Sequence, residues 1–202
     1  MNRRIVAFAL AGLMTLPVVS TMPIAAKSNQ KTVHRTFTSQ AALSIPGSGP
    51  ATPYPATITV KGLKQGKTVD VNVVLRGYSE SVPDDIDVLL VSPSGQTAVI
   101  MSDVGAAQAV NGITLTLDDA AANSLPDSGL LTSGTFRPTN ADSGIPDQFP
   151  APAPSANGSS ALSVFNGSNP NGEWRLFVND APGNGPGSIQ GWSLEITAKV
   201  KK

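Results

Sequence analysis

Six aspartates lie beside runs that predict β-strands, and carboxylates in such places are suited to bind calcium. They are Asp84, Asp85, Asp87, Asp103, Asp118 and Asp119. Ca²⁺ takes about six to eight oxygen ligands from carboxylates, carbonyls and water. Crowded carboxylates repel one another, and a cation removes that repulsion. Asp87 is the strongest candidate, because alternation along a strand points it away from its apolar neighbours Ile86 and Val88.

The calcium interpretation has an ordinary alternative. Aspartates at the ends of strands often accept hydrogen bonds from turn N–H groups or simply face solvent. The sequence leaves both interpretations open. The predicted calcium ligands are Asp85, Asp87, Asp103, Asp118 and Asp119.

Other site chemistries are poorly represented. A Ser-His-Asp triad needs a histidine base, and the only histidine is His34, which lies in a polar segment near the start of the chain. There is no Gly-x-Ser-x-Gly motif, and there is no cysteine to serve as a nucleophile or metal ligand. We therefore predict that the chain is not an enzyme.

Composition indicates a β protein. Charged residues make up 14% of the 202 residues, while glycine and proline number 19 and 17. This balance is typical of short strands joined by tight turns. The 14 basic and 14 acidic residues cancel, and no basic stripe stands out, which argues against a nucleic-acid partner.

The N-terminus predicts export. Arg3 and Arg4 precede an apolar run over residues 5–19, and small residues follow up to Ala26. This order is typical of a secretory signal peptide over residues 1–26. The run is shorter than the ~20 residues of a membrane span, so we expect a secreted or periplasmic product with no membrane span after cleavage. Residues 27–40 are predicted to be a flexible lead-in.

The segments that must position the aspartates alternate with period two. One alternating stretch covers residues 69–75, and others cover 113–117, 174–178 and 192–196. Ile86–Val91 and residues 98–101 are apolar almost throughout, which predicts strands buried on both faces. Ser92-Pro93-Ser94-Gly95-Gln96 between them predicts a hairpin turn. We predict an all-β fold: a jelly-roll-like β-sandwich of eight or nine strands over residues 41–197, followed by a basic tail at 198–202.

Two further features bear on function. Trp174 and Trp192 fall on the inward positions of their strands, so we predict that they anchor the core rather than bind sugar. Residues 138–160 are rich in proline and lack a strand pattern. That segment is either a solvated excursion or a binding loop.

Three blocks together resemble a known family. The first runs from Asp84 to Gly95; the second is Leu117-Asp118-Asp119-Ala120-Ala121 with Ser133-Gly134-Thr135-Phe136-Arg137-Pro138; the third runs from Leu162 to Leu194. Their order and spacing resemble the P domain (P/Homo B domain) of subtilisin-like proprotein convertases, in its bacterial exported form, over residues 41–197. The resemblance implies a jelly-roll sandwich that is not itself catalytic and that stabilises a neighbouring protease domain, which is missing here.

Three functions follow as alternatives. The first is an exported, non-catalytic module that binds or stabilises a partner. The second is a Ca²⁺-dependent adhesion or carbohydrate-binding module, and the third is an accessory chain of an exported subtilisin-like serine protease. The expected partner is a protein or an extracellular polysaccharide.

Overall fold

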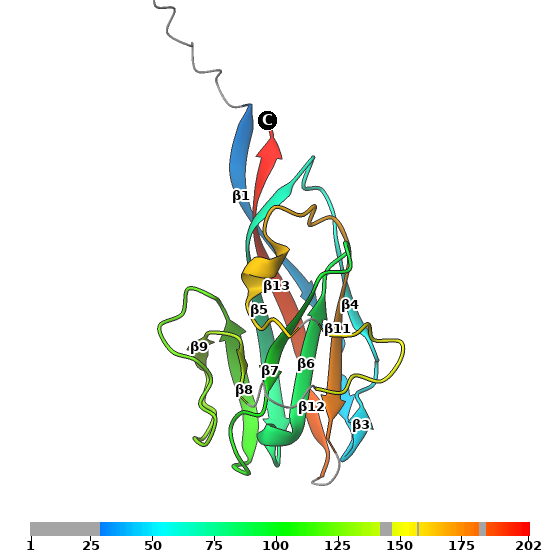
Figure 1. Cartoon of the computed structure of the whole chain (residues 1–202), viewed down its shortest axis with the longest axis vertical. Coiled ribbons are helices and arrows are strands. Elements are labelled where there is room, and N and C mark those ends of the chain that lie inside the picture. Colours follow the sequence, from blue (N-terminus) through cyan, green and yellow to red (C-terminus); the bar gives the residue numbers. More distant parts are fainter. Residues whose placement is uncertain (1–28, 142–146, 157, 182–184) are drawn as a thin grey trace, which may run out of the picture.

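The computed structural model describes residues 29–141, 147–156, 158–181 and 185–202, which form two stacked β-sheets (Figure 1). The seven-stranded sheet contains β1 (Gln30–Ser39), β2 (Leu43–Ile45), β5 (Lys67–Glu80), β8 (Val110–Leu117), β9 (Gly134–Phe136), β12 (Gly187–Ile189) and β13 (Gly191–Lys201). The six-stranded sheet contains β3 (Gly49–Pro50), β4 (Ala56–Val60), β6 (Ile86–Val91), β7 (Thr97–Ser102), β10 (Thr139–Asn140) and β11 (Gly172–Asp180). Two short 3-10 helices, η1 (Pro83–Asp85) and η2 (Leu162–Phe165), complete the elements.

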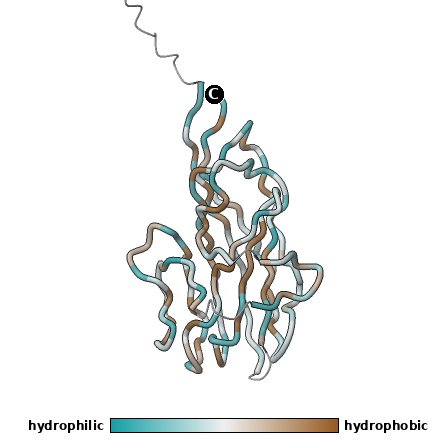
Figure 2. The backbone as a smooth tube through the Cα atoms, viewed as in Figure 1, coloured by the Kyte–Doolittle hydropathy of each residue, from teal (hydrophilic) through white to brown (hydrophobic). Residues whose placement is uncertain are grey.

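The core lies between the two sheets. Hydrophobic residues gather along the central strands in Figure 2, and the largest fully buried side chains include Trp174 and Trp192. Trp174 packs edge-on against Phe165 of η2, with ring centroids 5.0 Å apart. The all-β sandwich predicted from composition and alternation is confirmed, and both tryptophans are core residues.

The two apolar runs behave as predicted. Every residue of β6 and β7 is buried, and β6 lies between β7 and β11 in the middle of its sheet. The turn between them closes with the Ser92 N–H donating to the Gln96 carbonyl at 2.9 Å. Gly95 has a φ of 85°, which a residue with a Cβ rarely adopts.

The prediction of a flexible lead-in at residues 27–40 is wrong for residues 30–39, which form β1. This strand pairs with β13 over ten residue pairs, from Gln30 with Lys201 to Ser39 with Trp192. Only Val33 and Phe37 of β1 pack on the core, so the apolar signal recurs every fourth residue and alternation does not reveal the strand. The basic tail is likewise strand up to Lys201.

The described residues contain thirteen strands rather than eight or nine. The difference comes mainly from β2, β3, β9, β10 and β12, each two or three residues long. A period of two cannot show itself over so few residues. These strands exist because a neighbouring strand offers them free backbone groups.

The proline-rich segment is neither a solvated excursion nor an open binding loop where it is described. Phe149, Ala153 and Ala156 pack with Tyr54 on the outer face of the six-stranded sheet, against Leu89, Val91, Val99 and Phe177. The Tyr54 hydroxyl donates to the Pro150 carbonyl at 3.0 Å. The segment therefore covers an apolar sheet face that would otherwise meet water.

The predicted signal peptide over residues 1–26 lies outside the described residues. Among the residues that the structure does describe, no helix has the length and apolar character needed to cross a membrane.

Candidate functional site

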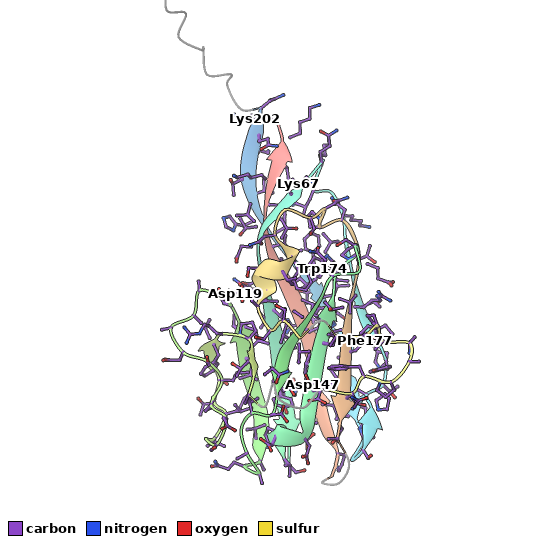
Figure 3. The ribbon with its side chains drawn as sticks, in the orientation of Figure 1. Lys67, Asp119, Asp147, Trp174, Phe177 and Lys202 are labelled. Atoms are coloured by element: carbon purple, nitrogen blue, oxygen red, sulfur yellow. The ribbon has the colours of Figure 1, made fainter. Side chains whose placement is uncertain are left out.

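The five predicted calcium ligands do not meet at one place. Figure 3 shows Asp119 well separated from Asp147, the aspartate beside which Asp87 and Asp103 lie. Asp119 accepts from the backbone N–H groups of Leu162 and Ser163, at 2.9 and 2.7 Å, and so caps η2. Asp118 accepts from the Ala120 N–H at 2.7 Å. These two aspartates stabilise turns, which is the alternative to calcium binding given above, and they lie apart from Asp87 and Asp103.

The other carboxylates gather around one hydroxyl. Ser102 Oγ lies 2.6 Å from Asp87 Oδ1, 2.7 Å from Asp147 Oδ1 and 2.9 Å from Asp103 Oδ2. A serine hydroxyl has a single proton, so it donates to one carboxylate at a time. The remaining carboxylate oxygens face the hydroxyl oxygen without a proton between them. This Ser102 cluster is therefore a place where protons or cations lower the energy.

The pKa of Asp87 is raised to about 7, mainly because the carboxyl group is buried. The Ser102 hydrogen bond is the next largest effect and lowers this pKa, while the charges of Asp147, Asp103 and Asp85 raise it further. Asp87 is 9% exposed, and desolvation disfavours its charged form. The group therefore changes charge near neutral pH.

Two amides complete the Ser102 cluster. Asn179 pairs with Asp87 across β6 and β11 and donates to the Gln148 carbonyl at 3.1 Å. Asn140 donates to Asp147 Oδ2 at 2.6 Å. The Oδ1 atoms of both amides are buried without a hydrogen-bond partner in the structure. These two amide oxygens carry partial negative charge and add to the negative electrostatic potential of the three carboxylates.

A second group of buried oxygens lies nearby. Glu80 and Asp180 are 4% and 3% exposed, and Glu80 Oε2, Asp180 Oδ2 and the Tyr78 hydroxyl are all buried without a partner in the structure. Burial and then the charges of Glu80 and Asp85 raise the pKa of Asp180 to about 6. Glu80 Oε1 holds the turn after β5 by accepting from the Ser81 and Val82 N–H groups.

These groups form one acidic end of the molecule. Burial, and then Asp103, Asp85 and Asp127, raise the pKa of Asp84, which connects the loop carrying Asp127 to the Ser102 cluster. No lysine or arginine contributes to the shifts of Asp84, Asp87 or Asp180. We define the acidic end as Glu80, Asp84, Asp85, Asp87, Asp103, Asp127, Asp147 and Asp180.

An exposed leucine lies beside the acidic end. Leu130 is 50% exposed, and Val69 is the only other large hydrophobic side chain classed as exposed among the described residues. The loop that carries Leu130 is tied to the acidic end by Asp127, whose carbonyl accepts from the Gly105 N–H at 2.8 Å. The sequence analysis does not identify Leu130, Asp147 and Asp180 as part of this surface, because they lie far from Asp87 in the chain, nor Glu80, because nothing in the alternation of its strand indicates a buried carboxylate.

The arrangement does not amount to a ready metal centre. Within the described ranges, no three histidine, cysteine, aspartate or glutamate side chains are arranged so that they could hold a metal ion. Calcium therefore stays a prediction, now limited to Asp85, Asp87 and Asp103 with Asp147.

His34 belongs to the sandwich and not to a segment outside it. Its Nδ1 lies 2.8 Å from Thr197 Oγ1, on the exposed face of β1 and β13. A cleft of about 330 Å³ opens there, lined by His34, Arg35, Thr36, Asp70, Asn72, Glu195, Ile196 and Thr197. Burial and then the charges of Asp118 and Asp119 raise the pKa of Asp70, while its Val71 hydrogen bond and His34 lower it. The lining residues include no serine or cysteine that could act as a nucleophile.

Comparison with known proteins gives limited matches. No protein family matches the chain, and no curated protein matches it. Two solved structures are similar: the serine protease (ASP) of Aeromonas sobria, and the same protease in complex with its chaperone (ORF2). Each shows 15% identity and a TM-score of 0.39, with 83% of this chain covered. The chain spans 27% of the length of each protease chain that it matches.

Proposed function

We propose that the chain is a non-catalytic binding module whose acidic end receives a protein partner rich in lysine and arginine. The observation that carries this proposal is the gathering of eight carboxylates at one end of the sandwich, with no lysine or arginine among the groups that shift the pKa values of Asp84, Asp87 and Asp180. A cationic partner binds more favourably to such a surface than to an isolated carboxylate, because it reduces the repulsion among several carboxylates at once.

The exposed Leu130 favours a protein over a metal ion or a sugar. Protein interfaces combine an apolar anchor with a polar rim. Leu130 supplies the anchor, and Asp84, Asp103 and Asp127 supply the rim. A sugar platform needs exposed aromatic rings, whereas both tryptophans are fully buried.

The non-catalytic part of the proposal rests on His34. It is the chain's only histidine, and its ring lies within hydrogen-bond distance of Thr197 in a cleft whose lining residues include neither serine nor cysteine. Purified chain should not hydrolyse peptide substrates. Turnover that a single Ser→Ala change abolishes would overturn this part.

A capture experiment tests the partner. The tagged chain is exposed to the culture medium of its source, and the bound proteins are compared between the wild type and the variant Leu130→Ser/Asp84→Asn/Asp127→Asn. The variant Val69→Ser/Asp70→Asn is the control, because it removes the other exposed large hydrophobic side chain and an acid elsewhere. We expect the first variant to retain ~10-fold less partner, equivalent to about 1.4 kcal/mol, and the control to behave as wild type.

The identity of the captured molecule separates the alternatives. A protein with a basic surface supports the proposal, and a subtilisin-like protease would make the chain its accessory. Capture that is equal for both variants would overturn the assignment to the acidic end. Capture of a polysaccharide alone would overturn the choice of a protein partner.

A further inference from the structure

The end of the sandwich where β1 begins and β13 ends is strongly basic. Eight of the eleven lysines and arginines among the described residues lie there: Lys31, Arg35, Lys61, Lys64, Lys67, Lys199, Lys201 and Lys202. We call them the basic end. Lys67 pairs with Lys199 across β5 and β13, and the Lys201 N–H donates to the Lys64 carbonyl at 3.2 Å. Figure 3 shows Lys67 and Lys202 toward one end of the molecule and Asp147 well away from them.

A groove runs through the basic end. Its volume is about 270 Å³, and five of its lining residues are cationic. These are Lys31, Arg35, Lys64, Lys201 and Lys202, while Val33, Leu63 and Val200 supply an apolar floor. A hollow of about 120 Å³ adjoins it, lined by Gln30, Lys31, Thr32 and Lys199. Neither hollow has an aspartate or glutamate among its lining residues.

This arrangement costs free energy that an anion would recover. Like charges within a Debye length, about 8 Å at physiological salt, repel one another. No ion pair joins a lysine or arginine of the basic end to a carboxylate in the described part of the chain. A ligand that carries several negative charges can therefore interact favourably with several of these cations at the same time.

The course of the chain points to the kind of anion. Lys202 donates its N–H to the Asn29 carbonyl at 3.1 Å, so the described chain starts at the basic end. The predicted signal peptide at residues 1–26 ends three residues earlier, so until its cleavage the sandwich is joined at its basic end to the segment that the sequence predicts to direct export across the membrane.

We propose that the basic end docks on anionic phospholipid headgroups at a membrane surface. The cations come from three segments at one end of the sandwich, namely β1, the turn between β4 and β5, and the end of β13, which suits a broad sheet of phosphates. Lysine and arginine near an anionic bilayer each add to its affinity. The apolar floor of the groove gives the lysine stems a surface along which to lie. The acidic end then faces away from the lipid.

Vesicle co-sedimentation tests this proposal. The purified chain, with its N-terminus established by mass spectrometry, is mixed with phosphatidylcholine vesicles with and without phosphatidylglycerol. We expect binding only where phosphatidylglycerol is present, and loss of binding at about 1 M salt, where the Debye length is about 3 Å. The wild type and all variants are compared with the same N-terminus, so any contribution from a retained leader is common to all of them.

Matched variants locate the binding surface. Lys64→Gln/Lys201→Gln removes two charges from the groove, while Arg137→Gln/Arg175→Gln removes two charges elsewhere, and melting curves establish that each variant is folded. We expect the first variant to bind anionic vesicles ~10-fold or more weakly, and the second to bind within about twofold of wild type. Equal binding to both vesicle types, or equal losses in both variants, would overturn the proposal. Binding to soluble polyphosphate but not to vesicles would assign the groove to a free polyanion instead.

The outcome is independent of the partner proposed for the acidic end. Neither lysine belongs to that end, and Leu130 does not line the groove. Loss of partner capture with intact vesicle binding, or the reverse, therefore shows which of the two proposals has failed.

Discussion

The carboxyl group of Asp87 shows how one residue couples the fold to pH. Its pKa is raised from 3.8 to about 7 by burial and by neighbouring carboxylates. The folded protein therefore binds a proton between pH ~4 and ~7 that the unfolded chain has released. The contribution of protonated Asp87 to the free energy of unfolding is fully present below pH ~4, and it is lost as the pH rises through this window.

The first prediction follows from that sign. Asp87→Asn keeps the shape of the side chain and its hydrogen bond with Ser102 but carries no charge. We expect the variant to be more stable than wild type at pH 8, by about 2–4 kcal/mol, and equally stable near pH 4. Urea unfolding at several pH values measures this difference. Glu173→Gln, an exposed change of the same charge, is the control, and an unchanged pH slope in Asp87→Asn would contradict the assignment.

The two buried tryptophans differ in one hydrogen bond. Trp174 Nε1–H donates to the Pro170 carbonyl at 2.8 Å, whereas Trp192 Nε1 is buried without a partner in the structure. Phenylalanine at either position leaves a similar gap, but only Trp174→Phe also breaks a hydrogen bond.

The second prediction compares these substitutions. Trp174→Phe should destabilise the protein by about 1–2 kcal/mol more than Trp192→Phe, because it leaves the Pro170 carbonyl unpaired. The comparison is made from urea midpoints and slopes. Equal losses, or a larger loss for Trp192→Phe, would show that the Trp192 N–H has a partner in solution.

The proline-rich segment illustrates a dependence between elements. The outer face of β6, β7 and β11 is apolar, with Leu89, Val99 and Phe177 fully or almost fully buried. They are buried because Phe149 and its neighbours lie over them and not because another sheet does. Tyr54 packs edge-on against Phe177 at a centroid distance of 5.0 Å and connects the cover to the sheet.

The third prediction tests this cover. Phe149→Ser should lower stability by about 2 kcal/mol and should increase binding of a dye that reports exposed apolar surface. Ala151→Ser, an exposed change in the same segment, is the control and should alter neither. Normal stability of Phe149→Ser would mean that the segment does not cover the sheet in solution.

Buried strands were easier to identify from the sequence than exposed ones. β6 and β7 are buried throughout, so their composition alone identified them. β1 is mostly exposed, and what holds it is ten paired residues of β13. A strand maintained by backbone hydrogen bonds with a distant segment leaves little trace in its own side chains, so the sequence alone does not reveal β1 as a strand.

At the scale of the whole molecule, charge is separated along the sandwich. The acidic end and the basic end carry most of the ionisable side chains, although the complete chain has equal numbers of basic and acidic residues. A net charge of zero therefore hides two surfaces of opposite sign. Each surface suits a different ligand, and attraction to either one should weaken as salt is raised.

The fourth prediction is that calcium binds only at the Ser102 cluster. We expect Ca²⁺ to raise the melting temperature at pH 8, where Asp87 is charged, and a chelator to reverse the rise. Asp87→Asn/Asp147→Asn should abolish the effect, whereas Asp118→Asn/Asp119→Asn should lower the melting temperature through lost caps and leave the calcium response unchanged. If Ca²⁺ does not change the melting temperature of the wild-type protein, the calcium prediction is wrong.

The sequence by itself determined the all-β class, the central strands, the hairpin turn at Gly95 and the burial of both tryptophans, because each depends on local alternation or on turn chemistry. Only the tertiary structure decided which carboxylates meet. It separated Asp118 and Asp119 from Asp87, and it brought Asp147 and Asn179 to Asp87 from distant parts of the chain. Contacts of that kind depend on strand order and register, and a single sequence does not encode either of them locally.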